Sequence, residues 1–114
     1  MNIETKIIEY LTEKGHKAYA NVPRKRPETF VTVERTGGGF DSVIIDRPTV
    51  AVQMWAPSRL AASELAYAVR DEILKMNELV GISKVSLNAL YNFPDADSGT
   101  NRYQAVFDFV TMEV

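Results

Sequence analysis

The sequence contains no cysteine and only one histidine, His16, among its 114 residues. The absence of cysteine excludes disulfides and thiolate zinc sites, and it is typical of proteins from a reducing compartment. A lone histidine lacks the second nitrogen or sulfur ligand that a zinc site needs. Catalysis by His16 would need a carboxylate or nucleophile beside it, and its position after Gly15 indicates an exposed or helix-capping side chain. The sequence therefore predicts no catalytic, cofactor-binding or metal site, and a protein that is not an enzyme.

Long apolar runs and a strong net charge are also missing. No run approaches the roughly 20 apolar residues that span a bilayer, and the first ten residues, MNIETKIIEY, lack the pattern of a secretion signal. The formal net charge of −2 provides no overall field that would attract nucleic acid or an anionic membrane. An apolar fraction of 46% and a charged fraction of 25% are ordinary for a soluble globular protein. We therefore expect an intracellular protein that folds as one domain over residues 1–114.

Hydrophobic spacing predicts two helices and several strands. Apolar residues recur at helical spacing in Ile3–Lys14 and again after Ser58, which is a good helix cap. Alternating apolar residues predict the main strands at Thr29–Glu34, Thr49–Ala56, Val85–Phe93 and Arg102–Met112. In the third of these, Val85, Leu87, Ala89, Tyr91 and Phe93 are expected on one face. The order α-β-β-β-α-β-β predicts a single α+β domain with a mixed or largely antiparallel sheet and two helices packed on one face.

Two loops resemble ligand sites only weakly. Three glycines at 37–39 could cradle a phosphate, but the Lys-Ser/Thr ending and the following helix of a phosphate loop are absent. Asp95, Asp97 and Ser98 precede Gly99 as in part of a calcium loop, yet the late bidentate glutamate is missing. A hairpin tip and a polar turn explain these segments without a ligand.

Charged loops offer the remaining candidate surfaces. Arg24-Lys25-Arg26 lies between two prolines and is either a solvated loop or a patch that faces an acidic partner or passing DNA. The stretch 35–48 is expected to be a long hairpin or excursion, with residues 43–45 as a candidate short strand. Arg35, Asp46 and Arg47 flank it and form either local ion pairs or pairs between subunits. Trp55, on the central strand, is expected in the core.

The sequence also resembles a known family over nearly its whole length. The matching segments are ETFVTVERTG at 28–37, DRPTVAVQMWA at 46–56, Ser58-Arg59 before an alanine-rich helix, and Pro94-Asp95, Gly99 and Arg102-Tyr103-Gln104 near the end. In these features the chain resembles the tail terminator proteins of phages and prophages of Gram-positive and actinobacterial hosts. These are small neck proteins that are often described as minor tail or head-tail joining proteins. The matching motifs are structural, and none performs chemistry.

The resemblance implies a structural virion protein that is assembled in the bacterial cytoplasm. Such a subunit forms a ring with copies of itself, commonly a hexamer, which caps the tail tube, ends its polymerisation and docks to the head-connector or head-closure protein. DNA would pass through the lumen without specific binding. In this interpretation, the subunit- or tube-facing residues are Arg35, Gly37, Gly38, Gly39, Asp46 and Arg47. The basic residues Arg24, Lys25 and Arg26 would face a partner or the lumen.

Other classes remain open at this stage. The chain could be a different neck or connector protein, or a tail-tube subunit, which would polymerise without limit instead of closing into a ring. It could also be a small cytoplasmic α+β binding adaptor that is unrelated to phage tails. If Arg35 and Arg47 contact a neighbouring subunit, replacing both with glutamate is expected to leave the fold intact and impair assembly.

Overall fold

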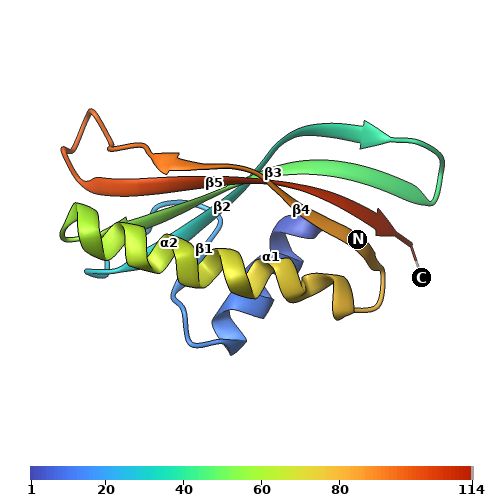
Figure 1. Ribbon diagram of the computed structural model, residues 1–114, viewed down its shortest axis with the longest axis horizontal. Coiled ribbons are helices and arrows are strands. Elements are labelled where there is room, and N and C mark those ends of the chain that lie inside the picture. The colour runs from blue at the N-terminus through green and yellow to red at the C-terminus, as the bar shows by residue number, and fades with distance from the viewer. Residues whose placement is uncertain (114) are drawn as a thin grey trace.

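The computed structural model describes residues 1–113, which form one sheet and two α-helices (Figure 1). The helices are α1 (Ile3–Glu13) and α2 (Arg59–Ile73), and a 3-10 segment, η1 (Leu74–Glu78), follows α2 directly. The strands are β1 (Ala18–Tyr19), β2 (Phe30–Phe40), β3 (Ile45–Ala56), β4 (Ile82–Asn92) and β5 (Asn101–Met112). The predicted α+β class and element order are confirmed; Val114, the end of the predicted domain, lies outside the described residues.

The five strands lie in the order β1-β2-β3-β5-β4. β1 runs parallel to β2 and the other neighbouring pairs are antiparallel, so the predicted mixed sheet is confirmed. Both helices pack on one face (Figure 1): α1 lies against β1 and β2, and α2 lies mainly over β3 and β5. Within the described chain, the opposite face carries no helix and β4 forms an open edge.

Side-chain caps fix where both helices begin. The Asn2 side-chain oxygen accepts a hydrogen bond from the Thr5 amide at 3.2 Å, and the Ser58 hydroxyl accepts one from the Ala61 amide at 3.1 Å. Such caps satisfy amides that have no acceptor within their own helix. After α1 the backbone turns at Gly15, whose φ of 94° favours glycine. Both helices therefore begin where the sequence predicts.

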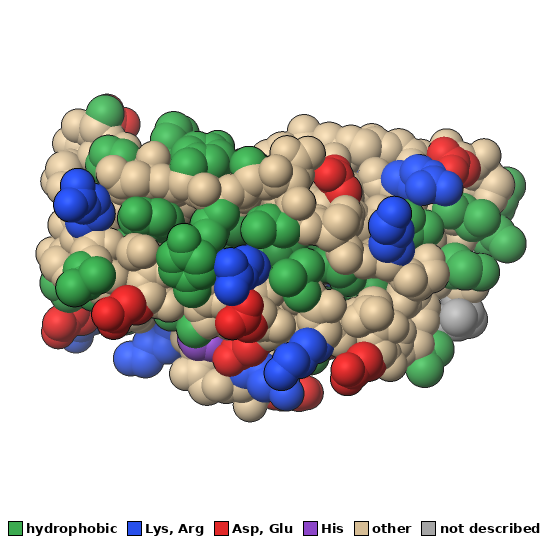
Figure 2. Space-filling view, viewed as in Figure 1, with side chains coloured by type: hydrophobic (Ala, Val, Ile, Leu, Met, Phe, Trp, Pro, Cys, Tyr) green, Lys and Arg blue, Asp and Glu red, His purple; other side chains and the backbone are tan. Residues whose placement is uncertain are grey.

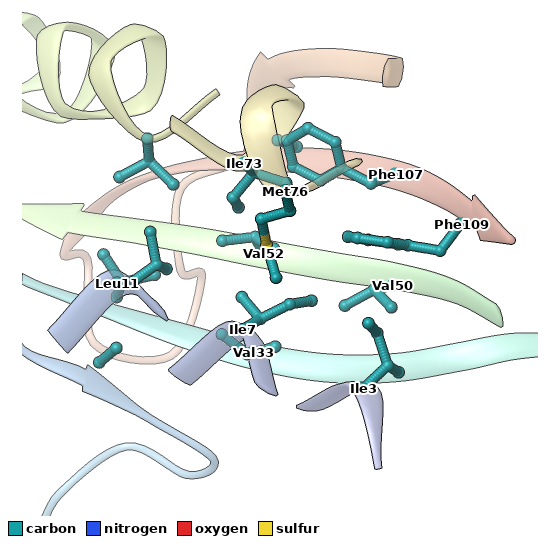
Figure 3. Close-up of a cluster of buried hydrophobic side chains, with 14 of the residues drawn as sticks. Ile3, Ile7, Leu11, Val33, Val50, Val52, Ile73, Met76, Phe107 and Phe109 are labelled. Carbon is teal, nitrogen blue, oxygen red and sulfur yellow. The ribbon is translucent and has the colours of Figure 1, made fainter. Parts of the chain in front are cut away.

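The hydrophobic core fills the space between the helices and the sheet (Figure 3). α1 contributes a stripe at helical spacing, and the strands contribute alternate side chains, because successive residues of a strand point to opposite faces. The labelled members, all buried, are Ile3, Ile7, Leu11, Val33, Val50, Val52, Ile73, Met76, Phe107 and Phe109. Trp55 is also buried as predicted, but it lies on the other face of β3, since the adjacent Met54 belongs to this core.

The sequence predicts that the alternate residues from Val85 onward all lie on one face of β4. This prediction is wrong beyond the middle of the strand, because β4 contains a bulge. Leu87 pairs with Phe107 and faces the core, but the register shifts before Ala89, which pairs with Val106. One extra residue in a strand reverses the alternation that follows it. As a result, Leu90 pairs with Ala105 on the core side, and the alternation predicted to continue through Ala89 is interrupted.

Of the two forms expected for the stretch 35–48, the structure shows the long hairpin. Residues up to Phe40 pair with β3, with one register shift between Arg35 and Gly37, and β3 begins at Ile45, so the turn comprises only residues 41–44. The separate strand suggested for 43–45 is therefore absent from the described structure, because Val43 and Ile44 lie in the turn. We call residues 36–48 the arm. It forms the right-hand end of the molecule in Figure 1, beyond the helices.

Candidate assembly surface

The base of the arm is fixed by a two-point ion pair. The Arg35 guanidinium donates to both carboxylate oxygens of Asp46, at 2.6 and 2.9 Å, and its Nε donates to the Gly37 carbonyl at 3.0 Å. Asp46 is only 5% exposed, so its charge depends on this partner. The hydrogen bond to Asp46 raises the pKa of Arg35 above its ordinary value. In addition, the Arg35 amide donates to a Glu4 carboxylate oxygen at 3.0 Å, which joins the arm to α1.

The charged residues that flank the stretch 35–48 thus form ion pairs within one chain. Arg35 pairs with the buried Asp46, and Arg47 pairs with Asp41 on the exposed surface of the arm. The expectation that glutamate at 35 and 47 leaves the fold intact is therefore corrected at Arg35. A glutamate there would face the Asp46 carboxylate and leave it buried without a counter-charge. Contact of Arg47 with a neighbouring subunit stays a prediction.

The three glycines of the arm differ in whether the backbone geometry requires glycine. Gly38 has a φ of 85°, and a Cβ built on it would lie 1.9 Å from the Arg47 carbonyl oxygen. Only glycine fits there, because the backbone of the opposite strand occupies the space of a side chain. A Cβ on Gly37 or Gly39 would meet nothing within 4 Å. The described fold therefore requires one of the three glycines and leaves space beside the other two.

Alanine substitutions at positions 37, 38 and 39 should distinguish the glycine that the fold requires from the two that it does not. We expect Gly38→Ala to lower the free energy of unfolding by about 1–3 kcal/mol, since it forces a positive φ on a side-chain-bearing residue. Gly37→Ala and Gly39→Ala, as matched controls, should change it little. Urea denaturation of the three variants measures the difference. Equal losses at all three positions would show that the chain itself needs the whole run.

The tip of the arm exposes large hydrophobic side chains. Phe40 is 65% exposed, Val43 92% and Ile44 52%, and Met112 at the end of β5 lies near them, because Ile45 pairs with Met112. Scattered apolar residues are normal on protein surfaces, but a cluster at the end of a projecting hairpin is typical of contact sites. The sequence analysis missed this tip because it treated Val43-Ile44 as part of a strand.

The basic loop is partly held by aromatic rings. Arg24, Lys25 and Arg26 are all exposed, and the Arg26 guanidinium also lies 5.3 Å from the ring centre of Trp55. Arg102 lies 4.9 Å from the same ring and 4.5 Å from that of Phe93. Trp55, which also stacks on Phe30, is covered on the helix-free face by these cations instead of by a helix. All three basic residues are exposed, and their contact with a partner stays a prediction.

A neutral polar row crosses the rest of the helix-free face. One row of side chains crosses four strands through hydrogen bonds: Thr32 donates to Gln53 at 3.2 Å, Gln53 donates to Gln104 at 2.8 Å, and Gln104 donates to Tyr91. These residues occupy the same register row of the sheet. Such a row satisfies its own polar groups and leaves little charge for binding a charged ligand.

The residues considered for chemistry lie in local contacts, and His16, expected to be exposed or to cap a helix, is instead partly buried beside a carboxylate. His16 Nε2 lies 2.8 Å from a Glu72 carboxylate oxygen, a contact that ties the end of α1 to α2 beside an open pocket of about 370 Å³. Asp95 accepts from the Ser98 hydroxyl at 2.5 Å, which lowers the pKa of Asp95, and its carbonyl accepts from the Gly99 amide. These bonds build a turn. Among residues 1–113 no group of three potential ligands that could hold a metal is present.

The chain was also compared with known proteins. No protein-family model matches it, and no curated protein matches its sequence. Within residues 1–113, neither helix has the length and apolar character needed to cross a membrane.

Proposed function

We propose that this protein is a structural virion subunit of the tail terminator type. It forms a ring with copies of itself on the end of a phage or prophage tail tube, ends tube growth and docks to the head-connector or head-closure protein. The observation that carries the proposal is the arm, a rigidly based hairpin with an exposed apolar tip. The resemblance of the sequence to tail terminators indicates which assembly the arm would join, namely a ring on a tail tube.

A ring requires that each subunit present two different surfaces, one that contacts the next copy and one that receives the previous copy. The arm suits the first role, because its apolar tip lies at one end of a molecule 41 Å long. Space beside Gly37 and Gly39 would allow another backbone to approach closely. A tightly paired base means that the arm needs little ordering when it binds, which lowers the entropic cost of association.

Passage of DNA through such a ring is compatible with the charges of the molecule. The net charge is −2 and a neutral polar row crosses the helix-free face, so a lumen lined by that row would not hold DNA tightly. Arg24, Lys25 and Arg26 would then face an acidic partner at the neck or the rim of the lumen.

Electron microscopy of purified tail tubes mixed with the protein tests the proposal, with light scattering of the protein alone. We expect one closed ring at one end of each tube and no lengthening of tubes in its presence. Tubes of unlimited length formed from the protein alone would identify a tube subunit instead. Tubes without rings, together with unchanged tube growth, would exclude the terminator role and favour a cytoplasmic adaptor.

A further inference from the structure

The open edge of the sheet carries an incompletely covered part of the core. α2 packs mainly over β3 and β5, and η1 lies against β4. Three core-facing side chains of β4 nevertheless stay only partly buried: Val85, Leu87 and Leu90. In Figure 2, hydrophobic side chains form a band between the sheet and α2 on this side of the molecule. A hydrophobic row beside unpaired strand backbone is typical of surfaces that accept an additional strand.

The same surface continues onto the first half of α2. Leu60 and Tyr67 lie two turns apart on the helix, and both side chains are exposed. Beside Leu60 an open groove of about 420 Å³ separates the helix from Asn92 and Tyr103 at the sheet. We call Leu60, Tyr67, Val85, Leu87 and Leu90 the edge surface. It is apolar, elongated and hollowed at one end, unlike the polar face on the other side of the sheet.

We infer that the edge surface receives the arm of a second copy of this chain, a contact that rests on the proposed assembly role and adds its receiving half. Val43 and Ile44 of the arm tip would cover the partly buried row, and the outer edge of the arm would lie along β4. Each copy would then give its arm to one neighbour and receive the arm of the other. Such head-to-tail contacts close into a ring when the rotation between copies permits.

Strand direction agrees with this pairing. β2, β3, β5 and β4 are successive antiparallel neighbours, so β2 and β4 run in opposite directions. The arm strand of a second copy in the same orientation would therefore lie antiparallel to β4 and continue the sheet. β1 and the Glu4 carboxylate occupy the edge of β2 only as far as Arg35. The arm itself lies beyond that point and keeps its outer edge open.

Charge complementarity favours a second copy as the occupant. β4 carries a single charged residue, Lys84, and the groove beside α2 carries Arg59, both exposed. At the opposite edge of the sheet, near the base of the arm, the side chains of Glu4 and Glu34 supply negative charge. Head-to-tail contact brings the basic edge of one copy toward the acidic edge of the next, whereas contact between two like edges would oppose equal charges.

Photo-crosslinking from the arm tip tests the inference directly. Val43 is replaced by a photoreactive benzoylphenylalanine, isotopically heavy and light proteins are mixed at high concentration and irradiated, and the linked peptides are identified by mass spectrometry. We expect heavy–light links from position 43 to residues 60–67 or 82–92. The same reactive residue at Val22, an exposed valine in the loop before β2, is the matched control and should give no such links.

Other outcomes overturn the inference. Links from position 43 to the arm tip of another copy would mean a symmetric tip-to-tip contact, and absence of heavy–light links to the edge surface would exclude this receiver. The result is independent of tail binding. Links to the edge surface without rings on tails would retain the contact and remove the tail role. Rings on tails without heavy–light links to the edge surface would retain the tail role and exclude this contact.

Discussion

Replacing Arg35 with alanine is expected to lower the free energy of unfolding by about 3 kcal/mol. Asp46 is nearly completely buried, and the two hydrogen bonds from Arg35 are the side-chain contacts that compensate its charge. Removing one partner of a buried ion pair leaves the other charge without compensation, which is the costly way to break such a pair. Urea denaturation followed by circular dichroism measures the loss.

The matched control for this prediction lies on the same arm. Arg47 pairs with Asp41 where both side chains are about half exposed, so Arg47→Ala should change stability little. The double variant Arg35→Ala/Asp46→Ala removes both charges and should recover part of the loss, because no uncompensated carboxylate remains. If Arg35→Ala and Arg47→Ala had equally small effects, the ion pair at the base would not be what holds the arm.

Helix positions and fold class were predictable because their signals are local. Asn2 and Ser58 are cap residues directly before apolar residues at helical spacing, and the structure uses both as caps. The order of helices and strands then restricts a chain of this length to a few α+β arrangements. The sequence does not contain a comparable signal for strand order, which depends on long-range pairing.

The features missed by the sequence analysis depend on contacts between distant residues. Glycine is depleted in strands, so 37–39 indicate a hairpin tip, yet these residues pair with β3 and Gly38 passes closely against the backbone of Arg47. The bulge before Ala89 likewise cannot be predicted from alternation. Arg26 belongs to a charge cluster in the sequence, and only the fold places it on Trp55.

These misses changed the candidate site more than the fold. A flexible loop would have to become ordered on binding, at a cost in entropy, whereas a paired hairpin presents its tip already formed. The residues predicted as contacts, Arg35 and Asp46, instead hold the arm in place. The exposed side chains at the tip, which the sequence analysis did not select, are the better candidates for contact with a neighbour.

Aspartate at the two most projecting positions of the tip should strongly weaken assembly without affecting the fold. Val43 and Ile44 are exposed, so Val43→Asp/Ile44→Asp removes no core packing, and its urea denaturation curve should match that of the unmodified protein. At an apolar interface the same changes remove hydrophobic contact and bury two carboxylates. Loss of one central interface side chain costs about 2 kcal/mol or more, so association between copies should weaken at least about 30-fold. Sedimentation velocity and counts of rings on tail tubes measure it.

Val22→Asp provides the control for added charge, since Val22 is an exposed valine in a loop that the proposal does not use. It should assemble normally. Gly37→Ala and Gly39→Ala provide an intermediate case: they retain the apolar tip but add methyl groups where the arm would approach a neighbouring strand. If these alanines weaken assembly while unfolding is unchanged, contact extends along the arm; if only the tip variants fail, contact is restricted to its end. Normal rings from Val43→Asp/Ile44→Asp would exclude the arm tip as an assembly element, because no interface would retain its affinity with two buried, unpaired carboxylates.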